Sequence, residues 1–332
     1  MFMKKRIALT CLLLVFVLFL AACGVSTETP EGGKNQAGSN WPTKTVEIVV
    51  PFKAGGDTDF NARTYGKYLE QELGQTVVVI NTEGAGGSLA AESVKTSKAD
   101  GYKIFFGNTG FLLNEITGIS DYTFDDAFET VGIVAKSAGE AIVVRSDLPV
   151  NTVPELIKLS QDNPGKYRIT SVTGGIMHYF AIRLNDLGGK FNIVDAGGVN
   201  DRIAALKGGH VDVIVNTVQT VMPYVESGDF KILAVTSDQR SDAYPDIPTC
   251  VEQGIDITIG LEYNMFLPKG TDQAIIEKLS QAIKNVSEKP EYADEIKKAY
   301  DQVPYLLNLS EAKERLFKQR DMFLEYKSLF QG

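Results

Sequence analysis

The 332-residue chain carries 33 lysines and arginines against 42 aspartates and glutamates, so its formal net charge is −9. This acidic balance argues against a nucleic-acid partner, but helix ends and backbone amides can still bind a small anion. Three cysteines and two histidines occur without the spacing of a metal site. We therefore predict no metal, no cofactor and no catalytic residue.

The N-terminus has the features of a lipoprotein signal peptide over residues 1–22. Basic residues at positions 4–6 precede an apolar run, Ile7 to Leu20, and small residues precede Cys23. Cleavage before Cys23 would leave its sulfur to carry the lipid and would lower the formal charge to −12, because three basic residues are lost. A transmembrane anchor is the alternative, but about 14 apolar residues are fewer than the roughly 20 that a span needs.

Residues 23–40 are polar and rich in Gly, Ser, Thr and Asn, which predicts a flexible tether. The predicted location is extracytoplasmic, with the protein anchored to the membrane by its lipid. Cys250 would then have no intramolecular partner, and a lone cysteine is usually a small core residue. About 290 residues follow the tether, which is enough for two lobes of ordinary size.

The first element after the tether is a strand, a glycine loop and a helix within Val46 to Arg63. An apolar, β-branched run ends at Pro51, which cannot donate to a sheet, and Gly55-Gly56 permits a tight turn. Thr58 or Asp59 could cap a helix that starts near Asn61. Ligands of open α/β sheets bind at the carboxyl ends of strands, and a helix N-terminus favours an anion. A plain turn without a ligand remains the alternative.

The remaining elements follow in an alternating order. We expect further strands at residues 76–80, 103–106, 141–144, 167–171, 211–215 and 230–236. We expect helices at residues 89–96, 154–161 (capped by Thr152), 201–207, 220–227, 271–286, 290–300 and 310–330. Residues 125–142 are assigned to a connection, and residues 257–267 to a crossing back to the first lobe. In the last helix, Leu316, Phe323, Leu324 and Phe330 are expected to face the core.

The stretch WPTKTVEIVVPFKAGGDTDFNAR, from Trp41, resembles the N-terminal signature of the Bug receptors. These are the TctC-type extracytoplasmic solute-binding proteins of tripartite tricarboxylate transporters. Ala54 departs from the pattern, which has proline there. Further matches lie in the loop 81–87, in Asp-Gly-Tyr at 100–102, in Asn-Pro-Gly-Lys at 163–166 and in 245–249, so that the resemblance covers most of residues 41–286.

The resemblance implies an α/β, two-lobed periplasmic-binding-protein-like fold of type II. Each lobe is a mixed sheet flanked by helices, with a ligand cleft between the lobes. Residues 41–143 and 258–332 would form lobe 1, and residues 144–257 lobe 2. The implied function is capture of a di- or tricarboxylate or related organic acid by hinge closure, and its delivery to the membrane subunits of the transporter. The receptor itself would be a monomer.

Two alternatives belong to other classes. The first is a sensor subunit that reports its ligand to a signalling system. The second is a secreted α/β hydrolase, which the sequence disfavours because Gly86-Gly87-Ser88-Leu89-Ala90 has alanine where a nucleophile elbow has its last glycine. We therefore predict that the protein is not an enzyme.

The candidate ligand-binding residues are loop residues at the strand ends of both lobes. In lobe 1 they are Phe52, Ala54, Gly55, Gly56, Asp57, Thr58, Asp59, Asn108 and Thr109. In lobe 2 they are Thr170, Thr173, Gly174, Gly175, His178, Asn216 and Thr217. A lone histidine at a position such as that of His178 is more often a structural group than a ligand contact. These motifs contain no arginine clamp, in agreement with the family mode of main-chain, hydroxyl and water-mediated contacts. Asp57 either points to solvent or receives an ammonium group of the ligand.

Overall fold

The computed structural model describes residues 40–330. The predicted signal peptide, Cys23 and almost all of the predicted tether lie outside the described residues. Within residues 40–330, none of the helices has the length and apolar character that a membrane span requires.

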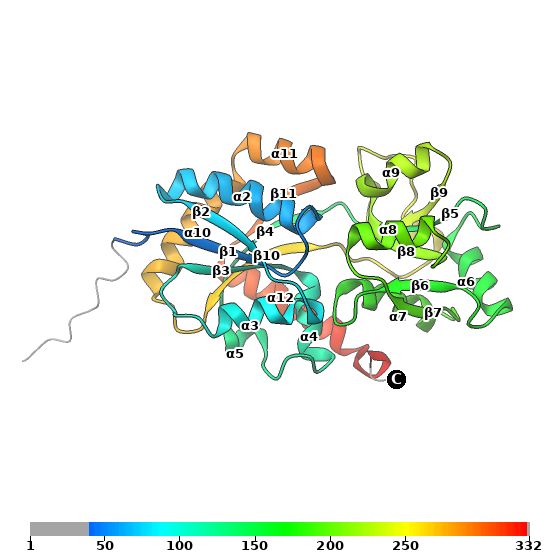
Figure 1. Ribbon diagram of the computed structural model, residues 1–332, viewed down its shortest axis with the longest axis horizontal. Helices are drawn as coiled ribbons and strands as arrows, with labels where there is room; N and C mark the ends of the chain where they lie inside the picture. The colour runs from blue at the N-terminus through cyan, green and yellow to red at the C-terminus, as the bar shows by residue number, and fades with distance from the viewer. Residues whose placement is uncertain (1–39, 331–332) are drawn as a thin grey trace, which may run out of the picture. The chain divides into compact units, whose positions relative to one another are not determined.

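The first lobe is built on a six-stranded mixed sheet with the order β11-β4-β10-β3-β1-β2 (Figure 1). Its strands β1, β2 and β3 are parallel, whereas β10 runs antiparallel to β3 and β4. The strands are β1 (Val46–Val50), β2 (Val77–Asn81), β3 (Lys103–Asn108), β4 (Phe128–Ser137), β10 (Glu262–Pro268) and β11 (Gln302–Leu307). The main helices are α2 (Asp57–Leu73), α3 (Ser88–Lys95), α10 (Gln273–Ser287), α11 (Pro290–Tyr300) and α12 (Leu309–Leu324).

The second lobe is built on a five-stranded mixed sheet with the order β7-β6-β8-β5-β9. Strand β5 runs antiparallel to both of its neighbours, β8 and β9. The strands are β5 (Glu140–Arg145), β6 (Arg168–Ser171), β7 (Asn192–Asp195), β8 (Val213–Thr217) and β9 (Phe230–Val235). The helices are α6 (Val153–Asp162), α7 (Ile176–Asp186), α8 (Val199–Lys207) and α9 (Val218–Glu226). The predicted architecture of two mixed sheets flanked by helices is confirmed.

Two chain crossings join the sheets, and they run side by side. The Ser137 amide donates to the Leu261 carbonyl at 2.8 Å, and the Leu261 amide donates back to the Ser137 hydroxyl at 3.0 Å. The sheets divide between Ser137 and Glu140, so β5 lies wholly in the second sheet although the predicted lobe boundary at 143/144 would split it. The assignment of residues 125–142 to a connection was wrong, because Phe128–Ser137 is a ten-residue strand.

The C-terminal segment forms a third contact between the lobes. Helix α12 packs on β4 of the first lobe, with Leu316 and Phe323 buried. Its far end reaches α7 of the second lobe, where the rings of Phe323 and Tyr326 lie 5.1 and 5.7 Å from that of Tyr179. The prediction that Leu324 faces the core was wrong. Successive helix residues point about 100° apart, and Leu324 is 40% exposed beside the buried Phe323.

Trp41, the single tryptophan of the chain, lies just before β1 at the end of that strand far from the glycine loop. Its ring packs against Tyr102 at a centroid distance of 6.1 Å and is buried. Gly101 makes this packing possible: its φ is +80°, and a Cβ there would lie 2.5 Å from Ile275 Cγ2 and 2.7 Å from Trp41 Nε1. Only glycine meets both demands.

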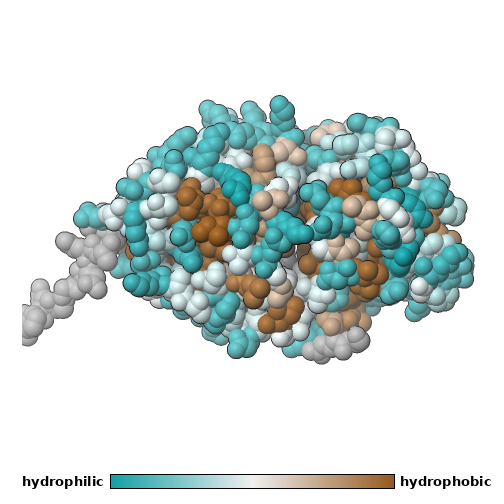
Figure 2. Space-filling model, in the orientation of Figure 1, coloured by the Kyte–Doolittle hydropathy of each residue, from teal (hydrophilic) through white to brown (hydrophobic). Residues whose placement is uncertain are grey.

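One edge of the first sheet carries exposed apolar side chains. The edge strand β2 leaves Val78 and Ile80 exposed, and apolar side chains gather over that side of the first sheet in Figure 2.

Cys250 is fully buried, as predicted for a core residue, and burial raises the pKa of its thiol to about 12. A thiol in that environment is chemically inert at neutral pH.

Candidate functional site

The two sheets present strand ends to each other. In the first lobe, the carboxyl end of β3 pairs with the amino end of β10, so Asn108 lies opposite Tyr263. In the second lobe, the carboxyl end of β8 pairs with the amino end of β5, so Thr217 lies opposite Glu140. Antiparallel strands therefore add their first residues to the same edge at which parallel strands end.

Helix N-termini face this interface from both lobes. Helix α2 follows Gly56 in the first lobe, and α7 follows Gly175 in the second. Neither N-cap supplies a side-chain acceptor, and neither does Thr217 at the start of α9. The first-turn amides of a helix lack intrahelical partners and favour an anion. The start of α2 at Asp57, before the predicted Asn61, corrects the expectation that Thr58 or Asp59 is its N-cap.

The loops that carry the candidate residues touch across the interface. Lys53 Nζ of the first lobe lies 3.0 Å from Asp201 Oδ2 of the second. Gly86 approaches the second lobe so closely that a Cβ there would lie 2.8 Å from the Thr173 carbonyl oxygen. A Cβ on Gly110 would likewise lie 2.8 Å from the Ile176 amide nitrogen. The glycine loops of the first lobe therefore contact the start of α7.

Asp59 holds the first glycine loop in place. Its carboxylate accepts hydrogen bonds from the Gly55 amide at 2.9 Å, from Arg63 Nε at 3.0 Å and from Asn81 Nδ2 at 2.8 Å. Burial opposes the ionisation of Asp59, but these hydrogen bonds outweigh it, and its pKa is lowered. Arg63 Nη2 also forms an ion pair with Asp59 Oδ1 at 3.0 Å, and the carboxylate acts on the loop from inside the helix.

Several other candidates are tied to groups of their own lobe. Asn108 accepts from the Gly110 amide and donates to the Thr58 hydroxyl at 3.2 Å, while the Thr109 hydroxyl bonds the Glu262 backbone. Asn216 accepts from Arg202 Nε at 2.7 Å. Ala54, Gly55 and Thr173 are exposed, whereas Phe52 and Gly56 are half-buried and Gly174 and Gly175 are buried. Thr170 is fully buried, and its hydroxyl has no partner among the described residues.

His178 lies against the C-terminal segment. Its ring packs edge-on against Phe330 at a centroid distance of 5.3 Å, and its Nδ1 has no hydrogen-bond partner within residues 40–330. Burial lowers the pKa of His178, against the opposing influence of Asp195. These surroundings are those of a packing residue of α7.

Sequence reasoning missed two charged residues at the interface, Glu140 and Arg202. Their exposed fractions are 1% and 4%, and that of Asp57 from the opposite lobe is 8%. Burial raises the pKa of Glu140 to about 8, the negative charge of Asp57 adds to this shift, and Arg202 opposes it. Burial lowers the pKa of Arg202 to about 10. An arginine in the first turn of α8 is unfavourable beside the positive end of the helix dipole. This unfavourable placement was the feature of the sequence that could have indicated a special role for Arg202.

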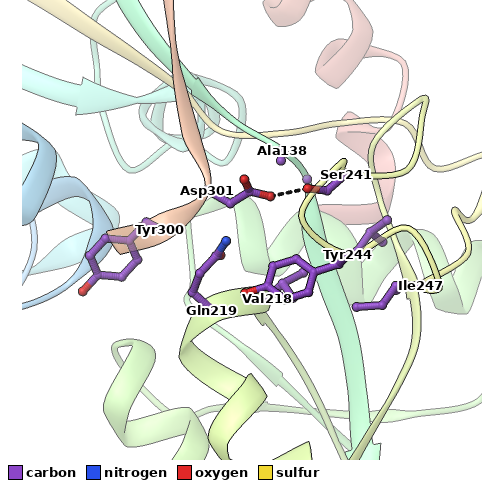
Figure 3. Close-up of a pocket in the computed structure, with 10 residues that line it drawn as sticks. Ala138, Val218, Gln219, Ser241, Tyr244, Ile247, Tyr300 and Asp301 are labelled. Carbon is purple, nitrogen blue, oxygen red and sulfur yellow. Dashed lines mark hydrogen bonds between the residues drawn. The ribbon is translucent and has the colours of Figure 1, made fainter. Parts of the chain in front are cut away.

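A small polar hollow also lies between the lobes, beside the first crossing (Figure 3). Asp301 of the first lobe accepts a hydrogen bond from Ser241 of the second lobe there. Tyr300 lines the same hollow and donates its hydroxyl to the Gly55 carbonyl at 2.9 Å. The hollow is therefore connected to the glycine loop through one tyrosine.

We expect Gly86→Ala to act as a wedge between the lobes and to weaken ligand binding about tenfold or more. Gly86 has φ +61°, so alanine also brings backbone strain of about 1 to 2 kcal/mol. Gly74→Ala is the matched control, because Gly74 has φ +65° but nothing within 4 Å of a Cβ. Chemical denaturation should show a loss of stability in both variants, larger for Gly86→Ala because its Cβ also lies 2.9 Å from Asn114 Oδ1, and calorimetry should show weaker binding only for Gly86→Ala. Equal binding by both variants would contradict the wedge.

The chain was compared with known proteins. Residues 61–317 match the model of the tripartite tricarboxylate transporter family receptor. The "UPF0065 protein in gbd 5'region" of Cupriavidus necator is 30% identical over 300 residues, which cover 87% of this chain and 90% of that protein. The structure of the periplasmic binding protein BugD is 29% identical, has a TM-score of 0.76 and matches over 87% of this chain and 98% of its own.

A structure from R. palustris, solved with adipate, has a TM-score of 0.79 at 23% identity, and the match covers 88% of this chain and 98% of that one. At that identity the likeness shows the fold alone. The family model and the Cupriavidus relative carry the assignment, since each spans most of the chain. The chain belongs to the tripartite tricarboxylate transporter receptor family, a family of extracytoplasmic solute-binding receptors and not of enzymes.

Proposed function

We propose that this receptor captures a small carboxylated metabolite between its two lobes by hinge closure. It then delivers the metabolite to a tripartite tricarboxylate-type membrane transporter. The receptor stays at the membrane through a lipid on Cys23 and works as a monomer. The ligand is a di- or tricarboxylate or a related organic acid.

The observation that carries this proposal is the pair of uncapped helix N-termini that face each other from opposite lobes. Helices α2 and α7 both begin after a glycine that provides no side-chain cap, so their first amides are available to a carboxylate. Closure of the lobes brings both sets of amides to one ligand. A fold neighbour was solved with adipate, a dicarboxylate, which is in keeping with a carboxylate as the class of ligand.

A hinge is also consistent with the connections between the sheets. The two crossings are bonded to each other through Ser137 and Leu261. Away from these crossings the lobes meet through exposed ion pairs such as Lys53 with Asp201, and through the packing of Phe323 and Tyr326 on Tyr179. Exposed ion pairs contribute little stability, so the main cost of separating the lobes lies in the contacts of the C-terminal segment with α7.

Ligand binding is testable by thermal denaturation of the purified protein with di- and tricarboxylates, amino acids and aromatic acids. A ligand at about 100 times its Kd should stabilise the folded protein by roughly 2.7 kcal/mol, which raises Tm. We expect a shift with one carboxylate class and confirmation by calorimetry with one ligand per chain. Absence of a shift with every acid, in protein first unfolded and refolded to remove any bound ligand, would contradict the proposal.

The lipid anchor is testable separately. We expect the wild-type protein to incorporate a labelled fatty acid and to fractionate with membranes when it is expressed in a bacterial host. Cys23→Ala should abolish both, whereas Cys250→Ala, at the buried cysteine, should retain both. Labelling of the Cys23→Ala protein would contradict the assignment of the acylated residue.

A further inference from the structure

We infer that the ligand is a zwitterion that carries an ammonium group beside its carboxylate. Asp57 and Glu140 receive the ammonium group, and Arg202 receives the carboxylate. This inference rests on the proposed function, because it concerns the class of ligand at the same interface.

The three charged groups come from three separate elements. Asp57 is the first residue of α2 in the first lobe, Glu140 opens β5 and Arg202 lies in the first turn of α8 in the second lobe. All three side chains are at least nine-tenths buried. Direct contacts bring the three together. Lys53, four residues before Asp57, lies 3.0 Å from Asp201, which precedes Arg202. Arg202 Nε bonds Asn216, which lies opposite Ala141, the neighbour of Glu140. No ion pair within 4.0 Å joins any two of the three within residues 40–330.

Within the described part of the chain, two hydrogen bonds hold the guanidinium of Arg202 in a fixed orientation, and one of its nitrogen atoms remains free to donate. Its Nε donates to Asn216 Oδ1 at 2.7 Å, and its Nη1 donates to the Gly197 carbonyl at 3.0 Å. Among the described residues, Nη2 has no acceptor. A guanidinium fixed on one side and open on the other is suited to a carboxylate.

The carboxyl groups of Asp57 and Glu140 also have oxygen atoms that can accept hydrogen bonds from a ligand. Asp57 Oδ2 accepts from the Tyr263 hydroxyl at 2.7 Å, but no cation of the described protein pairs with Asp57. Glu140 Oε1 is buried and has no hydrogen-bond partner within residues 40–330. An ammonium group has three donors and no acceptor, and these two acids offer it acceptors from both lobes.

The charge count at the interface favours a cationic group in the ligand. Asp57 offsets the charge of Arg202, Glu140 is protonated in the unliganded receptor at neutral pH, and the nearby cations are already engaged, Lys53 with Asp201 and Arg63 with Asp59. An uncompensated charge is costly in a buried site. A dicarboxylate would add two negative charges to this balanced set, whereas an amino acid adds one charge of each sign, and its ammonium group favours the ionised form of Glu140.

The experiment compares matched pairs of ligands by calorimetry, namely the twenty amino acids and the acids that lack only their α-amino group, such as aspartate and succinate. We expect at least one amino acid to bind tenfold or more tightly than its des-amino counterpart. Glu140→Gln should remove most of that preference. Asp201→Asn, which removes the same charge from the exposed side of the interface, should change the affinity for both partners of a pair equally.

The outcomes separate the inference from the proposed function. If des-amino acids bind as tightly as amino acids, or if Glu140→Gln keeps the preference, the inference is wrong while the receptor function stands. If neither series binds and other carboxylates also fail, the proposed function is wrong as well. Unliganded Tm values of both variants show whether each is folded, and Asp57→Asn provides a second test of the preference should Glu140→Gln fail to fold.

Discussion

Replacing Glu140 by glutamine is expected to stabilise the unliganded receptor at pH 8 and to leave its stability at pH 5 nearly unchanged. Burial raises the pKa of Glu140 to about 8 from an ordinary value of 4.5. The folded protein therefore binds the Glu140 proton more tightly than the unfolded chain does. The stability that this proton contributes is fully present below pH 4.5 and is lost as the pH rises through 8. A shift of this size corresponds to about 3 to 5 kcal/mol at most.

The measurement is the free energy of unfolding by urea, taken at intervals from pH 5 to pH 8.5 for both proteins. The difference between wild type and Glu140→Gln should grow with pH in favour of the variant. His178 has a lowered pKa and contributes with the opposite sign below about pH 6.5, but it is common to both proteins. A difference that stays constant over the range would contradict the protonated, buried state of Glu140.

A control of opposite sign is available at the same interface. The hydrogen bond from Lys53 lowers the pKa of Asp201, and the Gly198 amide adds to this effect. The contribution of Asp201 is therefore present above pH 3.8 and is lost only as the pH falls through its folded pKa. Asp201→Asn should leave the slope between pH 5 and pH 8 unchanged.

The second large effect is expected for Asn61→Leu, at the centre of a buried hydrogen-bond chain. Asn61 Nδ2 donates to Gln302 Oε1 at 2.5 Å, and Asn61 Oδ1 accepts from the Tyr292 hydroxyl at 3.0 Å. Leucine has a similar size but leaves both partners unsatisfied. Each unsatisfied buried polar group costs about 1 to 3 kcal/mol, so the loss of stability should be about 2 to 5 kcal/mol.

The same variant should also disturb the hydrogen bonds of Asp57 at the proposed ligand site. Gln302 Nε2 donates to the Tyr263 hydroxyl at 2.7 Å, and Tyr263 in turn bonds Asp57. The chain thus links the back of α2 to the carboxylate that faces the second lobe. Gln281→Leu, at an exposed amide bonded only to Asn285, is the control and should change the free energy of unfolding by no more than about 0.5 kcal/mol. Similar losses for both variants would contradict the importance of the buried chain.

Local signals in the sequence were sufficient for the glycine loop after β1 and for one helix cap. The glycine loop after β1 follows from Pro51 and Gly55, and the capping of α6 by Thr152 follows from a hydroxyl three residues before Glu155. Both depend on neighbours within a few positions. The predicted start of α2 was late because glycine took the N-cap position, while Asp59 bonds the loop from the first turn.

The missed elements depend on pairing between distant segments. Strand β4 lies between β10 and β11, whose residues follow it by more than 120 positions. Its sequence, FETVGIVAKS, contains a central glycine and charged residues near both ends, and no alternation signals a strand buried on both faces. Only its partners specify its place in the sheet.

The charged part of the site was missed for a related reason. Ligand residues were expected at the carboxyl ends of parallel strands, whereas both Glu140 and Tyr263 lie at the amino ends of antiparallel strands. Arg202 reaches the interface from inside a helix, fixed by Asn216, which the sequence did indicate. Whether the first or the last residue of a strand lies at the edge that faces the other lobe depends on the direction of that strand. The local sequence does not encode this direction.

The position of Trp41 determines which optical signals can report on this receptor. The indole is packed against Tyr102 and Gly101, at the end of β1 that points away from the second lobe. Movement of the lobes leaves that environment unchanged, so tryptophan emission should stay constant when a ligand binds and should change only when the first lobe unfolds. Constant fluorescence during a titration is therefore compatible with full occupancy, and a dye placed on the second lobe is needed to observe closure.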